Sequence, residues 1–382
     1  MRKWTGYMKG VNLGGWLSQF PDAVEMAEKR DADGNASDEL PESLLKHIDT
    51  FITGDDFKRV KDMGCDHVRI PVDYVLLENE AGDPRDIGFK KLHEAVSFCR
   101  ENGLNMIIDL HETYGYSFDP LKTWVDRKKF FYDDALQARF LKLWQRIVRE
   151  FLDDTDIVAF ELLNEIVLTD VYDAWNDVID KAVAAIREVS EDCWIVYGGV
   201  VYNNVTSVKL LRKPADDHIV FNFHCYDPMI FTHQAAYWVD DMTPDFRKTY
   251  HDTIGHYKEV SESLGKRYSE AAERAYLEGN PDNFLGKGDS LTPDSQMGPD
   301  FYRIIFKEAL DAAARFDAPL YCGEYGVIDK ADPRDAVEYI KDINTVFEES
   351  GIGRAYWNYR GKDFGIVDGY LGSYAEEFYK YL

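Results

Sequence analysis

The sequence predicts an α/β fold in which eight parallel strands close into a (β/α)8 barrel, the TIM-barrel architecture. Eight short apolar runs alternate with longer amphipathic stretches along the 382 residues. Strands that are apolar throughout and separated by helices are typical of a parallel sheet covered by helices, and eight such units favour a closed barrel over an open sheet. No GxGxxG motif follows the first run, which argues further against an open dinucleotide-binding sheet.

The predicted elements follow the chain in order. The strands lie at residues 8–13, 66–72, 104–110, 157–164, 194–199, 218–226, 318–327 and 353–359. The helices lie at residues 55–63, 89–103, 134–152, 172–189, 207–213, 301–316, 334–350 and 373–382. In the seventh helix, apolar residues recur every three or four positions and give one stripe for docking on the sheet. Gly103 and Gly351 stand where a helix should stop.

The chain is expected to form one catalytic barrel over residues 1–382, with one irregular connection. Residues 227–298, between the sixth strand and its helix, are too many for an ordinary loop of such a barrel. The helical patterns at 246–266 and 268–278 and the aromatic residues nearby predict a small helical subdomain inserted over the barrel mouth.

Charge and cysteine content exclude several classes of protein. A formal charge of −26 opposes binding to nucleic acid or to anionic membranes, and a neutral or cationic partner fits better. The five cysteines are scattered without a CxxC pair, so neither a disulfide framework nor a zinc site is indicated. The chain as given lacks a signal peptide and a membrane helix, so we expect an intracellular protein, or a secreted one if a leader was removed.

Two glutamates in "VAFELLNEI", residues 158–166, raise the question of function. Ionised carboxylates are costly inside an apolar run unless they are paired. Glu165 is expected to end its strand, whereas Glu161 begins the same strand deeper in the barrel. Because active sites of these barrels form at the carboxyl ends of the strands, Glu165 is the better catalytic candidate and Glu161 a buried, paired structural carboxylate.

The ends of the other predicted strands carry further polar and aromatic residues. In chain order they are Asn12, Arg69, His111, Asn164 with Glu165, His224 with Tyr226, Glu324 and Trp357. Two carboxylates facing each other across a cleft, without a metal-ligand cluster, are what glycoside hydrolysis needs. Arg69 and the Tyr226 hydroxyl would stabilise an ionised Glu324, and the charge of Glu324 would raise the pKa of Glu165.

This set resembles glycoside hydrolase family 5, a group of retaining β-glycosidases with this barrel. "ELLNE" (161–165) is similar to the family's fourth-strand motif and "CGEYG" (322–326) to its seventh-strand motif. Further stretches, "GVNLGGWLSQF" among them, resemble the clostridial endoglucanase C type of cellulase. The resemblance spans the chain and implies an endo-β-1,4-glucanase, or cellulase, acting on β-glucan chains, with no cofactor and no evident protein partner.

The resemblance also implies roles for single residues. Glu165 would be the general acid/base and Glu324 the nucleophile. The remaining family positions are supporting ones: Arg69 steadies the nucleophile, His111 and Asn164 bind the sugar that is cleaved, His224 lies beside the acid/base, Tyr226 hydrogen-bonds the nucleophile, and Trp357 forms the floor. A retaining mechanism would place the two carboxyl groups about 5 to 5.5 Å apart.

The sequence departs from the family pattern in two places. The frequent pair of histidines after the third strand is His111 followed by Glu112 here. The fungal exo-β-1,3-glucanases continue "GVNLGGWL" with a glutamate, whereas "SQFPD" follows here, which argues against that specificity.

Alternatives remain open from the sequence alone. The same machinery would serve a β-mannanase, a mixed-linkage glucanase or a β-1,3-glucanase. A metal-dependent barrel hydrolase using His111 and His224, or a sugar-binding protein without activity, belongs to a different class. The candidates for stacking on additional sugar rings are Tyr114, Tyr116, Trp124 and Trp238.

Overall fold

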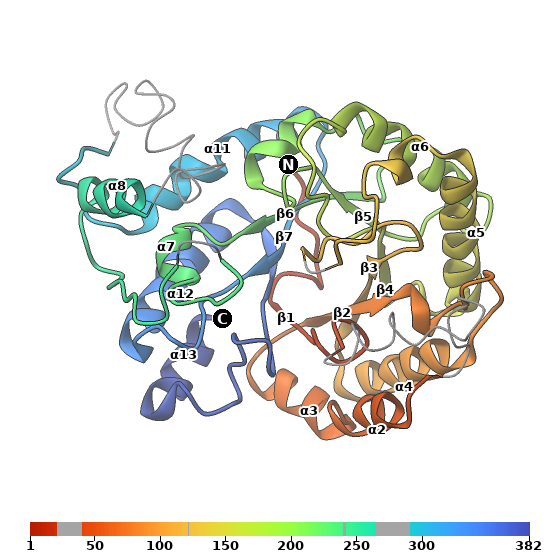
Figure 1. The fold of residues 1–382 in the computed structure, drawn as a ribbon, viewed down its shortest axis with the longest axis horizontal. Coiled ribbons are helices and arrows are strands. Elements are labelled where there is room, and N and C mark those ends of the chain that lie inside the picture. Colours follow the sequence, from red (N-terminus) through yellow and green to blue (C-terminus); the bar gives the residue numbers. More distant parts are fainter. Residues whose placement is uncertain (21–39, 121, 240–241, 265–290) are drawn as a thin grey trace.

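A closed barrel of eight parallel strands forms the centre of the molecule (Figure 1). The computed structural model describes residues 1–20, 40–120, 122–239, 242–264 and 291–382. Each strand pairs in parallel with the next along the chain, and β8 closes on β1. The strands are β1 (Gly10–Asn12), β2 (His67–Asp73), β3 (Asn105–Glu112), β4 (Val158–Glu161), β5 (Ile195–Gly198), β6 (Ile219–Cys225), β7 (Leu320–Tyr325) and β8 (Gly353–Tyr356). The predicted barrel is therefore confirmed.

The barrel interior changes from apolar to charged along its axis. Near the amino-terminal ends of the strands, Trp4 stacks on Tyr7 with 3.9 Å between the ring centroids, and both pack in one cluster with inward-facing residues such as Ile107 and Val220. Two residues further along the same strands, the buried side chains are Asp109 and Asn222. Because side chains alternate between the faces of a strand, positions two apart share the interior. The carboxyl ends of the strands thus carry a polar layer over an apolar floor.

Helices cover the outside of the barrel (Figure 1). They are α2 (Glu42–Thr50), α3 (Gly54–Asp62), α4 (Asp86–Asn102), α5 (Asp134–Glu150), α6 (Tyr172–Arg187), α11 (Pro299–Arg315), α12 (Pro333–Ser350) and α13 (Ala375–Tyr381). Gly103 and Gly351 end α4 and α12 in the left-handed conformation, as predicted. The helix predicted at 207–213 is wrong, since η4 (Val205–Leu210) is a short 3-10 helix that Asn204 caps. Helix α2 was not predicted.

The connection between β6 and α11 contains two described helices, α7 (Met229–Thr232) and α8 (Ile254–Ser263). The helix predicted from residue 246 begins only at Ile254, because the Thr253 side chain caps the backbone of His256. Before it, the backbone of Lys248 is held by the side chain of Gln234. The helix predicted at 268–278 lies outside the described residues.

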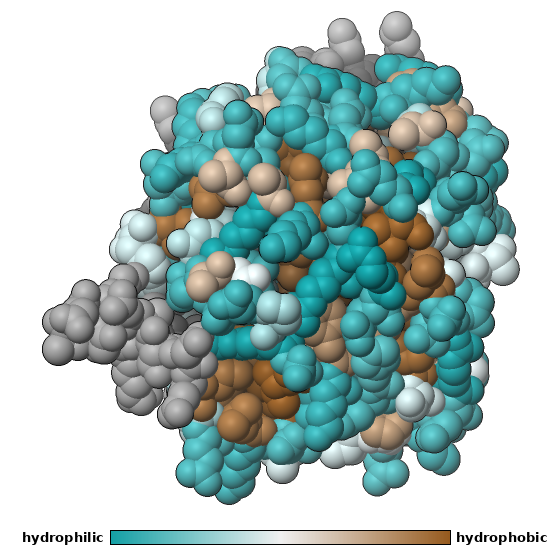
Figure 2. Space-filling view, turned by 90° about the vertical axis from the view of Figure 1, so that its right-hand side faces the viewer, coloured by the Kyte–Doolittle hydropathy of each residue, from teal (hydrophilic) through white to brown (hydrophobic). Residues whose placement is uncertain are grey.

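The outer surface on the side that carries α5 is mostly hydrophilic (Figure 2). Hydrophobic residues on this face lie in several separate areas between hydrophilic ones. Among the described residues, no helix is both long enough and apolar enough to cross a membrane.

Candidate active site

Arg69 is the central cation of the polar layer. It lies on β2, opposite Asn12 of β1, and its side chain is fully buried. Its guanidinium donates to both oxygens of Glu161, at 2.6 and 2.8 Å, and pairs with Asp109 at 3.0 Å and with Glu324 at 2.9 Å. A buried guanidinium needs such partners, because an unpaired charge is costly away from water. Arg69 therefore ties three strands to β2 and fixes one oxygen of Glu324.

Glu324 lies near the end of β7 with two donors on its carboxylate. Arg69 donates to Oε1 and the Tyr226 hydroxyl donates to Oε2, each at 2.9 Å. Burial raises the pKa of Glu324, while Arg69, His111 and the hydrogen bond from Tyr226 act in the opposite direction. These neighbours favour the ionised form of a group that burial alone would leave protonated.

Glu165 follows β4 and reaches into the mouth from the opposite side. The strand ends at Glu161, so the expectation that Glu165 ends it and Glu161 begins it is wrong by four residues. The barrel pairing nevertheless continues past the strand, because Leu162 N donates to Val196 O and Asn164 N to Leu110 O. Burial raises the pKa of Glu165 well above its usual range, and the charge of Glu324 raises it further.

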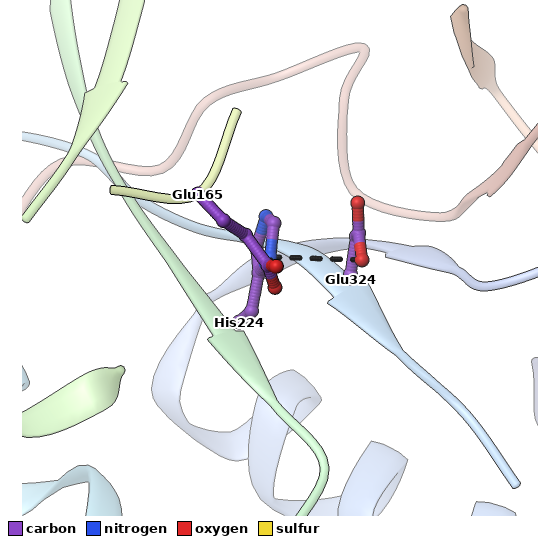
Figure 3. A group of neighbouring side chains, drawn as sticks. All are labelled: Glu165, His224 and Glu324. Carbon is purple, nitrogen blue, oxygen red and sulfur yellow. Dashed lines mark hydrogen bonds and ion pairs between the residues drawn. The ribbon is translucent and has the colours of Figure 1, made fainter. Parts of the chain in front are cut away.

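His224 connects the two carboxyl groups (Figure 3). It projects from β6 and its Nδ1 lies 2.9 Å from Glu165 Oε1 and 3.6 Å from Glu324 Oε2. Burial, together with Arg69 and His111, lowers the pKa of His224 well below its usual range, so the ring is neutral. One oxygen of each glutamate and one His224 nitrogen lie within 4.8 Å of one another. The two carboxyl groups are therefore close enough to act on the same bond.

His111 and Trp357 form the other wall of the mouth. Their rings are parallel within 5°, with 5.9 Å between the centroids. The His111 Nδ1 lies 2.7 Å from Asp109, and burial lowers the pKa of His111 to about 3, so its ring is also neutral. Its Nε2 is buried without a hydrogen-bond partner among the described residues. A neutral ring nitrogen beside the carboxylates can hydrogen-bond a sugar hydroxyl.

Asn12 and Asn164 support Arg69. Asn12 accepts from the guanidinium at 2.9 Å and donates to the carbonyl of Gly323, next to Glu324. Asn164 accepts from the guanidinium at 3.0 Å. All nine residues predicted for the site therefore gather at the same end of the barrel.

Glu161 is buried and paired, as expected, although it ends β4 and does not begin it. Besides Arg69, it accepts from Asn222 at 2.7 Å, and its side chain is fully buried. Asp109 was missed by the sequence analysis, although it holds both Arg69 and His111. The signal was present, because Asp109 lies two residues before His111 in a strand and so shares its face.

The four aromatic stacking candidates have different surroundings. Tyr116 is only 1% exposed and its hydroxyl donates to the Glu165 carbonyl, so it has no face for a sugar ring. The ring of Tyr114 lies 3.7 Å from the Arg139 guanidinium, which occupies one face. Trp124 is 54% exposed, and Trp238 packs beside Phe364 at 6.4 Å between centroids. Trp124 and Trp238 stay predictions for sugar contacts.

One group at the site has the composition of a metal site. Glu165, His224 and Glu324 could each supply one ligand atom to a cation. This group does not include His111, which the metal hypothesis had paired with His224. Arg69 already supplies a positive charge to Glu324, and His224 is engaged by Glu165.

Comparison with known proteins assigns the fold and the family. Residues 30–363 match the profile of the cellulases, glycosyl hydrolase family 5. The chain belongs to this family. It is 33% identical to cellodextrinase A from Ruminococcus flavefaciens, over 93% of this chain and 86% of that protein. It is 31% identical to endoglucanase C from Acetivibrio thermocellus, over 95% of this chain and 94% of that protein.

A solved endoglucanase has the same fold, with a TM-score of 0.68 at 22% identity, covering 98% of this chain and 97% of the other. The family predicted from the strand-end motifs is therefore confirmed, and the protein is a glycoside hydrolase.

Proposed function

We propose that the protein is a retaining endo-β-1,4-glucanase that hydrolyses β-glucan chains by double displacement. The observation that carries this proposal is the short separation of two carboxyl groups with different partners. One oxygen of Glu165 and one of Glu324 lie within 4.8 Å of each other. Retaining glycosidases have carboxyl groups about 5 to 5.5 Å apart, whereas inverting enzymes leave roughly 6.5 to 9.5 Å for a water molecule.

In the first step, Glu324 attacks the anomeric carbon while Glu165 protonates the departing glycosidic oxygen. Arg69 and Tyr226 hold Glu324 ionised and aimed, because both donate to its oxygens. The product of this step is an ester between Glu324 and the sugar, which removes the negative charge of Glu324. The pKa of Glu165 then falls, since that charge had raised it.

In the second step, Glu165 acts as a base and removes a proton from the water that attacks the ester. Neutral His224 is suited to both steps. With its proton on Nε2, the ring can accept a hydrogen bond from protonated Glu165, and with its proton on Nδ1 it can donate to ionised Glu165. Trp357 and His111 would contact the sugar from one wall of the mouth.

The choice of β-1,4-glucan draws on the relatives named cellodextrinase A and endoglucanase C. The experiment has two parts. Mass spectrometry after incubation with a 2-fluoro cellobioside should find the label on Glu324, and an unlabelled Glu324 in active enzyme would refute double displacement. Hydrolysis rates should be higher on soluble cellulose than on mannan, laminarin or mixed-linkage glucan. A higher rate on one of the other glycans would make that glycan the substrate.

We further infer that residues 227–298 form an inserted subdomain that walls one side of the cleft. Support comes from its described part, where His233 packs on Tyr226 at 4.9 Å and Trp238 packs on Phe364. Phe231 and Tyr250 also pack on Tyr339 of α12, so deleting the whole segment would expose core. Trp238→Ala is the cleaner test. It should raise KM for polymer more than for a short glycoside, and equal changes would refute the inference.

A further inference from the structure

The backbone leaves the barrel sheet just before Tyr226. Strand β6 ends at Cys225, so its pairing with β7 does not extend to Tyr226. The Tyr226 hydroxyl nevertheless reaches Glu324 Oε2, to which it donates at 2.9 Å. Burial raises the pKa of Tyr226 well above its usual range, so the hydroxyl keeps its proton and remains a donor. The position of this donor therefore depends on contacts outside the sheet.

Thr232, the last residue of α7, makes one of these contacts. Its side chain is fully buried, and its hydroxyl donates to the backbone carbonyl of Tyr226. The Thr232 carbonyl in turn accepts from Ile328 N at 2.9 Å, and Ile328 lies in the loop that follows β7. Helix α7 therefore bridges the chain that leaves β6 and the chain that leaves β7, the two strands that carry Tyr226 and Glu324 at their ends.

The same hydroxyl also fixes the ring of His233. The Thr232 oxygen lies 3.1 Å from His233 Nδ1, and burial lowers the pKa of His233 to about 4, so the ring is neutral. Because the Tyr226 carbonyl uses the hydroxyl proton, the Thr232 oxygen accepts here and the ring proton lies on Nδ1. The His233 ring packs edge-on against Tyr226 at 4.9 Å between centroids, and Phe364 packs against both rings. One hydroxyl thus orders both the backbone and a ring neighbour of Tyr226.

Thr232 can reach the charges around Glu324 through one residue. The titratable groups that face Glu324 are Arg69 of β2, Asp109 and His111 of β3, Glu165 after β4, His224 of β6 and Tyr226 after it. Within the described part of the chain, Thr232 hydrogen-bonds none of these except Tyr226. Thr232 carries no charge of its own, so a change there that alters the ionisation of Glu324 acts by moving the Tyr226 hydroxyl.

We propose that Thr232 is a positioning residue for the nucleophile, because it holds the Tyr226 hydroxyl against Glu324. The inserted segment then does more than wall the cleft, since its first helix influences how readily the nucleophile ionises. This inference rests on the proposed roles of Tyr226 and Glu324 in double displacement, and it adds to them a fully buried residue with no surface for the substrate.

The test measures Thr232→Val in two backgrounds, on a dinitrophenyl β-cellobioside whose leaving group needs no proton. In the otherwise unaltered enzyme, a displaced Tyr226 hydroxyl stabilises ionised Glu324 less, so the acidic limb of kcat/KM should move to higher pH. On that limb kcat/KM should fall about three- to tenfold, as expected for the loss of one neutral hydrogen bond. In the Tyr226→Phe background the same substitution should move the limb no further, because the donor that Thr232 positions is absent.

Two matched variants accompany this test. Thr232→Ser keeps the hydroxyl and should restore the acidic limb of the unaltered enzyme. Thr253→Val removes the hydroxyl that caps α8 in the same segment and should leave the limb in place. Thermal unfolding checks that each variant folds, and Thr232→Ala takes the place of Thr232→Val if the valine variant does not fold.

Two outcomes would overturn the inference in distinguishable ways. Equal losses from Thr232→Val in both backgrounds, without a shift of the acidic limb, would show that Thr232 serves stability alone, while the proposed double displacement stands. If Tyr226→Phe itself leaves the acidic limb in place, the proposed role of Tyr226 is wrong and the inference about Thr232 falls with it.

Discussion

The two sides of the catalytic mouth differ in the charges that they place beside their carboxyl groups. On the β7 side, Glu324 receives one hydrogen bond from a guanidinium and one from a phenol. On the β4 and β6 side, Glu165 has a neutral imidazole as its partner. Burial raises the pKa of both carboxyl groups and Arg69 opposes this effect on both, but Glu324 also accepts a hydrogen bond from Tyr226, whereas the charge of Glu324 raises the pKa of Glu165 further. The difference shows that the surroundings of Glu324 favour its ionised form, whereas those of Glu165 favour its protonated form.

Glu324→Gln should have the largest effect, because it removes the group that forms the covalent intermediate. We expect turnover to fall by at least about 10⁴-fold on every glycoside, including those with excellent leaving groups, as is typical when a covalent nucleophile is lost. The measurement is the rate of dinitrophenolate release from the cellobioside. Residual rates above one per cent of the unaltered enzyme's rate would show that Glu324 is not the nucleophile.

Glu165→Ala should have a large effect that depends on the substrate. A dinitrophenolate leaves without a proton, so the ester on Glu324 should form quickly and then persist, because water lacks its base. Azide needs no deprotonation and should restore turnover as a β-glycosyl azide. Azide should not rescue Glu324→Gln in this way, so the contrast between the two variants tests directly which glutamate is the acid/base and which is the nucleophile.

Tyr226→Phe should have a moderate effect that is visible in the pH profile. The Tyr226 hydroxyl stabilises ionised Glu324, so its loss raises the pKa of Glu324 and moves the acidic limb of kcat/KM to higher pH. A hydrogen bond to a charged group contributes about 1.5–3 kcal/mol, which corresponds to a shift of about 1–2 pH units. The basic limb, which reports Glu165, should move little. A shift of the basic limb alone would reverse the assignment.

Much of this arrangement could be predicted from the sequence, for an identifiable reason. Strand ends converge in a parallel barrel, so Arg69, His224 and Glu324 could be placed together without coordinates. The motifs around these residues also predicted the family. The termination of β4 at Glu161 could not be predicted, because apolar residues continue to Leu163 and backbone hydrogen bonds to the neighbouring strands continue to Asn164.

The ion pair between Glu112 at the end of β3 and Lys122 could not be predicted either, because Lys122 comes from an irregular loop whose approach to the strand end no local pattern specifies. The helix expected at 207–213 failed for a local reason, since Asn204 starts a tighter 3-10 turn there.

Glu161→Gln should have the smallest effect on activity. This variant tests whether Glu161, the deeper carboxylate, takes part in catalysis as Glu165 and Glu324 do. Glu161 binds Arg69 through both oxygens and lies on the β4 strand below Glu165. Glutamine keeps one acceptor, so we expect kcat to fall less than about tenfold with no azide rescue, and the free energy of unfolding to fall by about 1–3 kcal/mol from the poorly satisfied donor.

The pH dependence of that loss identifies its cause. Burial raises the pKa of Glu161 from 4.5 to about 7, with Arg69 opposing the shift. A carboxyl group with a raised pKa stabilises the folded state below its unfolded pKa, and this contribution is lost as the pH rises through the folded pKa. Glutamine does not titrate, so the difference in unfolding free energy between the two proteins should shrink between pH 4.5 and 7, as measured by urea titration. A difference that grows across this window would show that the Arg69 ion pair outweighs burial and lowers the pKa of Glu161 in the folded state. Azide rescue at Glu161 would show that Glu161, and not Glu165, is the acid/base.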